Sequence, residues 1–251
     1  MERPSSPTPE VKLGRTFTAS IVVLIVGLAL LLFATSGGQS FTTETLRRQQ
    51  VSAQPQRLDA FAVTTASGEK TSLSALLANI TYRDSNEGGN TGGSAVGKVW
   101  LVDFVYTRCQ TVCSSLGSIY QQLQADIESR GLQGKVGLLS ISFDPANDDA
   151  AALSAYSARM RMNPAIWQIA TLSNWADRRR LLDAFGIMVV PAPLGEFEHN
   201  AALHVVTSDA HLTQIIDYAA YPSAIDQALA IAFIAGQRNA APTKPELRAA
   251  K

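Results

Sequence analysis

The chain has 251 residues, of which 46% are hydrophobic and 17% are charged, a composition that indicates a folded protein and excludes a disordered one. Lysine and arginine together number 21, as do aspartate and glutamate, so no net charge attracts the chain to nucleic acid or to an anionic membrane surface. This length suits one domain with additional segments.

An uncharged, almost wholly apolar run covers residues 16–34, near the start of the chain. At about 1.5 Å per residue, a helix of about 20 residues crosses a bilayer core of about 30 Å. No polar face interrupts the run, which argues against a buried helix of a globular domain. The run therefore predicts one transmembrane helix.

Basic residues flank this run on its N-terminal side. Lys12 and Arg15 precede it, and the next basic residue is Arg47. The positive-inside rule then places residues 1–15 in the cytoplasm and the rest of the chain beyond the membrane. Ala34-Thr-Ser36 is a weak cleavage site, which leaves a removed signal peptide as the alternative to an anchor. Both interpretations put the globular domain in the periplasm or extracytoplasmic space, and the anchor predicts a single-pass protein of the inner (plasma) membrane.

The exported part divides by composition. Residues 35–56 are polar and lack apolar periodicity, so they predict a linker. The folded domain is expected over residues 57–236, and residues 237–251 have the character of a flexible tail. Inside the domain, residues 82–97 are rich in Gly, Asn and Ser and predict a long surface loop.

Strands and helices are expected to alternate along the domain. Residues 99–105 and 136–143 are apolar runs with β-branched side chains, and each predicts a strand buried on both faces. Shorter strands are expected at 61–63 and 167–170, a hairpin at 203–207 and 212–216, helices at 114–130, 150–161, 175–185 and 225–236, and a brief helix start at 71–77. This order predicts an α/β domain with a central mixed β-sheet flanked by helices.

The chain has two cysteines, and both lie in Cys109-Gln-Thr-Val-Cys113, directly after the strand expected at 99–105. A disulfide scaffold places cysteines far apart, because cross-linking a long loop constrains the unfolded chain most. A bridge across this short loop adds little stability, so the pair indicates chemistry. The alternative is that both are inert, buried cysteines that pack as small hydrophobic residues.

The position of Cys109 and Cys113 between a strand and a helix favours thiolates. Free N–H groups and the dipole at a helix N-terminus stabilise an anion and lower the pKa of a thiol. Three intervening residues put the sulfurs about one turn apart, with Cβ atoms about 5–6 Å apart on a helix, so a modest movement would form a disulfide. Two thiolates on one face also suit Cu(I), with zinc as a competitor. The residues thus indicate a redox pair, a metal site, or both.

Three histidines are candidates for a further metal ligand. His199 lies in a polar loop just before an expected strand, where loops at one edge of an α/β sheet converge. His204 lies inside that strand, so we expect a structural role for it, either in the packed core or on the surface of the strand. His211 lies in or beside the hairpin turn and is expected to be solvated. For a lone loop histidine a structural role is the default, and the spacing of the residues leaves the choice open.

Three segments carry a resemblance to a known family. The first, Val102-Asp-Phe-Val-Tyr-Thr-Arg-Cys-Gln-Thr-Val-Cys113, resembles the strand and Tyr-Thr-x-Cys-x-x-x-Cys motif of the Sco/SenC family, the thioredoxin-like copper proteins of cytochrome c oxidase assembly. The second, Ser140-Ile-Ser-Phe-Asp-Pro-Ala-Asn-Asp148, is similar to that family's second strand with Asp-Pro-x-x-Asp. The third, residues 199–209, is similar to its histidine, strand and hairpin turn. The resemblance covers roughly residues 57–236, and the single preceding span is similar too.

The resemblance implies a thioredoxin-like fold and one copper ion held by Cys109, Cys113 and His199. It also implies a role in building the dinuclear copper centre of cytochrome c oxidase subunit II, by delivering copper, by reducing the target's cysteines, or by both. The chain departs from the family at Ser114, where proline is usual, at Asn200, where Ser or Thr is common, at Asp209-Ala210, where Asp-Gly is usual, and in the long segment 82–97. These departures indicate a divergent paralogue, which leaves another periplasmic copper protein open as the partner.

Four functions remain open from the sequence. A copper metallochaperone is favoured, because His199 would serve as a third soft-site ligand. The main alternative is a thiol–disulfide oxidoreductase in which Cys109 and Cys113 form the redox pair, so whether the chain is an enzyme stays undecided. A thiol peroxidase and a copper or redox sensor are the other two hypotheses. We expect a monomeric globular domain and no nucleic-acid partner.

Four polar residues near the cysteines are expected to have structural roles. Asp144 and Asp148 either cap the helix expected from Ala150 or hold the site loop through hydrogen bonds, and the sequence favours the cap. Tyr106 and Thr107 are expected to shape the cysteine loop.

Overall fold

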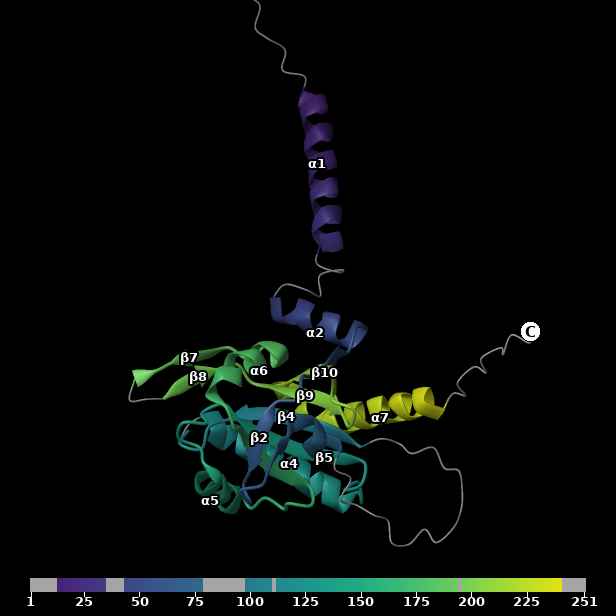
Figure 1. Ribbon diagram of the computed structural model, residues 1–251. Coiled ribbons are helices and arrows are strands. Elements are labelled where there is room, and N and C mark those ends of the chain that lie inside the picture. Colours follow the sequence, from purple (N-terminus) through teal and green to yellow (C-terminus); the bar gives the residue numbers. More distant parts are fainter. Residues whose placement is uncertain (1–12, 35–42, 79–97, 110–111, 194–195, 241–251) are drawn as a thin grey trace, which may run out of the picture. The chain divides into compact units, whose positions relative to one another are not determined.

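The computed structural model describes residues 13–34, 43–78, 98–109, 112–193 and 196–240 (Figure 1). The chain divides into two compact units, Met1–Gln49 and Gln50–Lys251. The surface loop predicted at 82–97 lies outside the described residues.

The first unit contains helix α1 (Leu13–Ala34), which covers the segment predicted to span the membrane. Its side chains are described for residues 17–30, and all of these are exposed. Among the described residues, no helix is long and apolar enough to cross a membrane.

The predicted linker, residues 35–56, is partly folded. It contains helix α2 (Thr43–Ala53), in which Glu44 pairs with Arg48 one turn later at 3.1 Å, and strand β1 (Gln56–Arg57). Val51 is only 6% exposed and belongs to the core of the second unit, and β1 pairs with the edge of its sheet. The sequence did not predict this helix, because it is short and mostly polar and is supported by paired charges and one buried valine rather than by an apolar stripe.

The second unit is built on an eight-stranded mixed sheet with the strand order β1-β10-β9-β4-β5-β6-β2-β3 (Figure 1). Its central strands β4, β5 and β6 are parallel, and all the other neighbours are antiparallel. The mixed α/β architecture predicted from the sequence is confirmed. The strand bounds are β2 (Ala62–Thr65), β3 (Lys70–Ser72), β4 (Val99–Val105), β5 (Val136–Ser142), β6 (Trp167–Leu172), β9 (Ala202–Thr207) and β10 (His211–Asp217).

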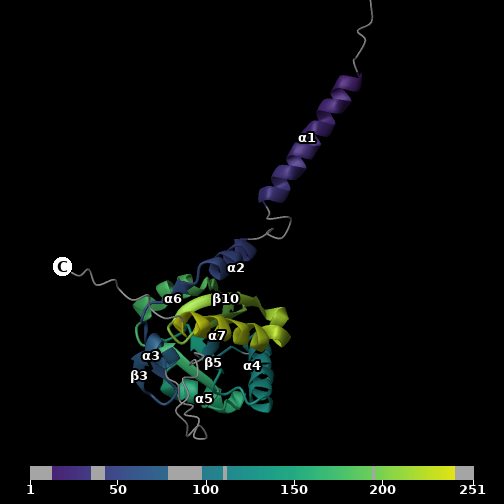
Figure 2. The same cartoon turned by 90° about the vertical axis from the view of Figure 1, so that its right-hand side faces the viewer.

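Helices cover both faces of this sheet, and every residue of β4 is therefore buried. Its Trp100, Val102 and Phe104 pack in a cluster with α3 (Leu73–Ala78) and α6 (Arg178–Phe185). The alternate residues Val99 and Leu101 pack with α4 (Val112–Ser129) and α7 (Ala224–Ala240), and α7 lies across this face in Figure 2. Helix α5 (Ala150–Met160) packs on the same side, and short 3-10 turns, η1 (Trp175–Asp177) and η3 (Tyr218–Ser223), precede α6 and α7.

A small separate hairpin, β7 (Val189–Pro191) and β8 (Phe197–His199), follows α6. Val189 lies directly opposite His199 in its register. Asn200 fixes the hairpin to the end of α6: its Oδ1 accepts from the Met188 N–H at 2.7 Å, and its Nδ2 donates to the Gly186 carbonyl at 3.0 Å. The sequence did not predict this hairpin, because strands of three residues carry too little period-2 pattern to be recognised.

Candidate metal and thiol site

The cysteine loop leaves the carboxyl end of β4 and enters α4. Tyr106 follows the strand directly, and the Cys109 N–H donates to its carbonyl at 3.2 Å, which closes a tight turn. Cys109 is 8% exposed. The backbone of Cys113 lies in the first turn of α4, and its side chain lies outside the described residues. The backbone therefore has the strand–cysteine–helix order that the sequence predicts.

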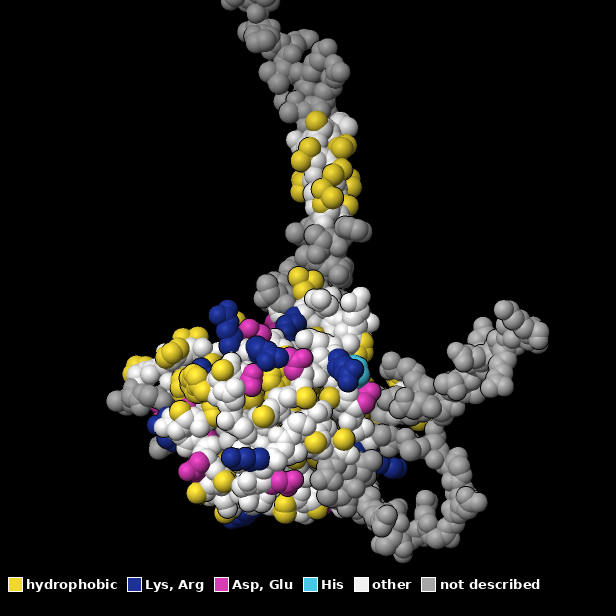
Figure 3. Space-filling view, in the orientation of Figure 1, with side chains coloured by type: hydrophobic (Ala, Val, Ile, Leu, Met, Phe, Trp, Pro, Cys, Tyr) yellow, Lys and Arg dark blue, Asp and Glu magenta, His cyan; other side chains and the backbone are white. Residues whose placement is uncertain are grey.

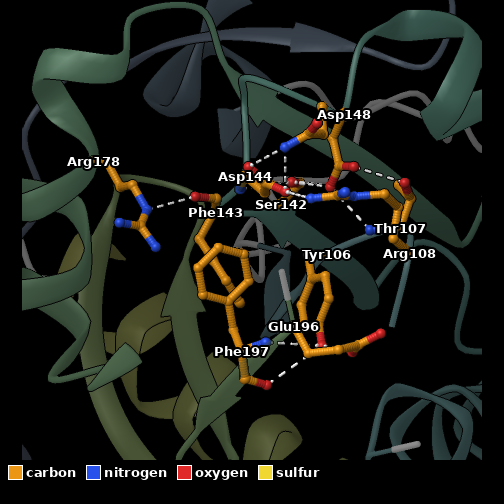
Figure 4. Close-up of polar contacts among 11 residues, drawn as sticks. Tyr106, Thr107, Arg108, Ser142, Phe143, Asp144, Asp148, Arg178, Glu196 and Phe197 are labelled. Atoms are coloured by element: carbon orange, nitrogen blue, oxygen red, sulfur yellow. Dashed lines mark hydrogen bonds and ion pairs between the residues drawn. The ribbon is translucent and has the colours of Figure 1, made fainter. Parts of the chain in front are cut away.

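Asp148 holds this loop from the segment between β5 and α5. Its carboxylate accepts the Thr107 N–H at 2.9 Å, the Thr107 hydroxyl at 2.6 Å and the Ser142 hydroxyl at 2.5 Å (Figure 4). The carboxylate is fully buried, so these three donors replace the water it has lost. Thr107 thus shapes the cysteine loop, as predicted.

Asp144 holds Arg108, the residue after Thr107 in the cysteine loop. Its carboxylate pairs with Arg108 at 3.1 Å and accepts from the side chain of Asn147 at 2.9 and 3.0 Å. The prediction that Asp144 and Asp148 cap the following helix is wrong, because Asp149 is the cap and accepts the Ala152 N–H at 2.8 Å. The alternative interpretation, that the two carboxylates hold the site loop, is the one that the structure shows.

Tyr106 connects the cysteine loop to the hairpin. Its hydroxyl donates to the Glu196 carboxylate at 2.5 Å and accepts the Phe197 N–H at 3.2 Å (Figure 4). Burial raises the pKa of Tyr106, and the hydrogen bond to Glu196 and the neighbouring Cys109 thiol raise it further. A neutral tyrosine is thus fixed between Cys109 and strand β8. Glu196 was not recognised in the sequence, because 90 residues separate it from Tyr106 and no local pattern marks it.

His199, the last residue of β8, presents a nitrogen suited to a metal. Its Nδ1 lies 3.1 Å from the Asn200 carbonyl. Its Nε2 is buried and has no hydrogen-bond partner among the described residues. Burial lowers the pKa of His199, which favours the neutral ring that binds metal ions. With the proton on Nδ1 and donated to the carbonyl, the lone pair of Nε2 is available to a ligand.

An aromatic cluster brings His199 and Cys109 into one region. The ring of Phe143 lies 5.1 Å from the His199 ring and 5.4 Å from that of Tyr106, whose hydroxyl neighbours Cys109. Phe197 packs against both Tyr106 and Phe143 at 5.3 and 5.6 Å. Phe143 comes from the end of β5 and Phe197 from β8, so this cluster depends on tertiary packing. From the sequence, Phe143 was expected only as the last residue of a buried strand, and Phe197 was not singled out.

The donor set in this region fits a soft ion. A buried thiol and a neutral imidazole nitrogen are the ligand types that copper and zinc prefer. The described part of the chain contains no group of three or more His, Cys, Asp and Glu side chains arranged to hold a metal ion. Because the Cys113 side chain lies outside that part, the set of Cys109, Cys113 and His199 stays a prediction.

The other two histidines lie away from this arrangement. His204 has the structural role expected of it and is buried in β9, with Nδ1 at 3.2 Å from the Val102 carbonyl and Nε2 at 3.1 Å from the Phe185 carbonyl. His211 begins β10 and lies 3.2 Å from Asp209 across the hairpin turn. In that turn Ala210 has φ 61°, the left-handed conformation in which glycine is favoured, which explains why Asp-Gly is the usual pair there.

Together, the fold and the site define a thioredoxin-like α/β domain with a thiol loop at a strand–helix junction and, near it, a half-buried histidine whose Nε2 is inaccessible to solvent. The family model SCO1/SenC matches residues 70–233, well over half of the chain. The chain belongs to the SCO1/SenC family.

Individual relatives are distant. The SCO1 protein homolog of Bacillus subtilis (strain 168) is 26% identical over 118 residues, which cover 46% of this chain and 60% of that protein's length. BsSco, a member of the Sco family of cytochrome c oxidase assembly proteins in which a disulfide switch was identified, is 20% identical with a TM-score of 0.55, over 72% of this chain and 96% of that one. Copper-bound yeast Sco1 is 14% identical with a TM-score of 0.51, over 78% and 96%. At these identities the structural matches establish the fold.

Proposed function

We propose that this protein is a copper metallochaperone that holds one copper ion through Cys109, Cys113 and His199. The observation that carries the proposal is the buried Nε2 of His199, which lacks a partner among the described residues and lies one aromatic ring from the Cys109 loop. Leaving such a nitrogen unsatisfied costs about 1–3 kcal/mol, which a bound soft ion would offset.

The protein's own residues would prepare this site for its cargo. Asp148 and Asp144 fix the loop at Thr107 and Arg108, while Tyr106 fixes β8 against the same loop. Both sources of ligands are therefore held before copper arrives, which reduces the ordering cost of binding. Yeast Sco1 binds copper and BsSco belongs to a family of oxidase assembly proteins, which supports copper as the cargo. The recipient we propose is the dinuclear copper site of cytochrome c oxidase subunit II.

Copper binding by the reduced protein tests this proposal. We expect one tightly held copper per chain for the wild type, and weaker binding or an altered Cu(II) spectrum for Cys109→Ala, Cys113→Ala and His199→Ala. His211→Ala is the matched control, because that histidine is partly exposed and lies on the far hairpin turn. A wild-type protein that retains no copper, or a His199→Ala protein with unchanged affinity and spectrum, would contradict the three-ligand site.

A second candidate function is thiol–disulfide exchange, which the position of Cys109 before the N-terminus of α4 favours. The Cys109 thiolate would attack a partner's disulfide and form a mixed disulfide. Cys113 would then displace the partner's sulfur, leaving a Cys109–Cys113 disulfide and a reduced partner that takes up two protons. Rapid exchange that survives His199→Ala, in a protein that binds no copper, would favour this function over the metallochaperone.

We also propose an extracytoplasmic location, based on the apolar run 16–34 and the basic residues before it. Whether the run is an anchor or a cleaved signal is decided by the mass and the membrane fractionation of the mature protein. Protease added to intact spheroplasts should degrade the globular domain, whereas protection of that domain would contradict the proposed orientation.

A further inference from the structure

A surface pocket lies beside the hairpin that carries His199. Its volume is about 540 Å³, and it is formed between η1, the start of α6 and the chain entering β7. Its lining includes Trp175, Arg178, Arg179, Leu182, Met188 and Val189. We call it the Arg178 pocket.

The rim of the Arg178 pocket is unusually apolar for a surface. Met188 is 70% exposed and Trp175 is 53% exposed, and Val190, next along β7, is 58% exposed. In Figure 3 hydrophobic side chains gather over β7 and β8, at the left of the view. Exposed apolar residues grouped in this way, rather than scattered singly, are typical of protein–protein contact sites.

Arg178 supplies a positive charge to a pocket whose lining also contains one carboxylate, that of Asp183. Its Nε donates to the Phe143 carbonyl at 2.7 Å (Figure 4). Its guanidinium lies over the rings of Trp175, Phe197 and Phe143 at 4.9, 5.5 and 5.7 Å. Within the described ranges no carboxylate lies within 4.0 Å of it, whereas its neighbour Arg179 pairs with Asp183. Stacking on aromatic faces holds the guanidinium plane in place, with its terminal nitrogens left to form a bidentate pair with a carboxylate.

The pocket and the candidate metal site share structural elements. Phe143, beneath Arg178, is also the ring that packs against His199 at 5.1 Å. Val189, in the pocket lining, lies directly opposite His199 in the β7–β8 register. A molecule seated in the Arg178 pocket would therefore contact the residues that position His199, and its own metal ligands could approach copper from that side.

We propose that the Arg178 pocket docks the protein that exchanges copper with this site, through a segment that carries a carboxylate next to an apolar side chain. The carboxylate pairs with Arg178, and the apolar side chain packs between Trp175 and Met188. A protein segment fits better than a small anion, because the apolar rim continues along β7 to Val190 and beyond the reach of a single carboxylate. Paired charge and apolar burial at one place are the features of an interface hot spot. The identity of the partner rests on the proposed function.

Complex formation between the reduced, metal-free protein and the soluble domain of cytochrome c oxidase subunit II tests the docking. We expect Arg178→Gln to weaken the affinity at least tenfold by removing the charge pair. Met188→Glu, at a position too exposed to disturb the core, is expected to weaken it similarly by repelling the partner's carboxylate. Arg179→Gln is the matched control, with an expected change of less than twofold, because this side chain is 92% exposed and already pairs with Asp183. Equal affinities for all four proteins, or no complex with the wild type, would overturn the proposal.

Copper transfer separates this proposal from the proposed function. A Cu(I)-loaded Met188→Glu protein should deliver copper to the subunit II domain at least tenfold more slowly than the wild type. Its delivery to a small chelator, bathocuproine disulfonate, should change less than twofold, since a chelator needs no docking surface. If the wild type binds no copper, the metallochaperone function is refuted. The docking is then still tested by the affinity of the metal-free protein for the subunit II domain. Displacement of the partner by millimolar acetate would identify a small-anion site instead and overturn the docking.

Discussion

Asp103 is a buried carboxyl whose replacement should remove its contribution to the pH dependence of stability. It lies in the middle of β4, is 1% exposed, and its Oδ1 has no hydrogen-bond partner within the described part of the chain. Burial raises its pKa to about 7, although a hydrogen bond from Ser140 lowers it in part. The side chains of Tyr120 and Tyr218 face it, and burial raises the pKa of each, so neither ionises at neutral pH.

The sign and size of the effect follow from linkage. In the unfolded chain Asp103 titrates near pH 4, so between about pH 4 and pH 7 the folded state holds a proton that the unfolded state has released. The free energy of unfolding therefore falls as pH rises through this window. From pH 5 to above pH 7 the difference spans about two pKa units, or roughly 3 kcal/mol at about 1.4 kcal/mol per unit.

Urea unfolding of wild type and Asp103→Asn at pH 5 and pH 8, with the cysteines kept reduced, measures this contribution. Other titrating groups act equally on both proteins, and any packing cost of the amide is independent of pH. We expect the stability of Asp103→Asn relative to wild type to increase by roughly 3 kcal/mol from pH 5 to pH 8. A change below about 1 kcal/mol would mean that Asp103 is hydrated in the folded protein and would refute the reasoning.

Other substitutions test the loop and the sheet. Asp148→Ala removes the acceptor of three hydrogen bonds, so we expect a loss of about 2–4 kcal/mol in urea unfolding and weaker copper binding. Asp149→Ala removes only a helix cap, and an effect of about 1 kcal/mol with unchanged copper binding is expected; equal effects on copper would contradict the role of Asp148. Gly137→Ala places a Cβ 2.7 Å from the side chains of Lys98 and Trp100, so about 1–3 kcal/mol of destabilisation is expected. Gly117→Ala meets only the flexible end of Met160 and should be milder, and the reverse order of melting temperatures would show that β5 adjusts more easily than α4.

The sequence by itself determined most of the strands and helices of the sheet domain. Continuous apolar runs predicted the buried strands β4 and β5, and the 3.6-residue spacing after Cys113 predicted α4. The position of His204 within an apolar strand predicted a structural role, and the structure shows that the side chain is buried. These inferences succeed because a fully buried strand is a continuous apolar run and a helix with one buried face has apolar residues at regular spacing. Both patterns are visible in a short stretch of sequence.

Only the tertiary structure decided which distant side chains meet. Tyr106 and Glu196 are 90 residues apart and Thr107 and Asp148 are 41 apart, so their hydrogen bonds leave no local periodicity to read. The helix cap is Asp149 rather than Asp148, a difference of one position in the chain. Asp148 instead accepts hydrogen bonds from the cysteine loop. The β7–β8 hairpin, too short to be recognised, sets His199 against Phe143 and beside the Arg178 pocket. Local pattern specifies what is buried, whereas the packing of strands and helices specifies against which partner.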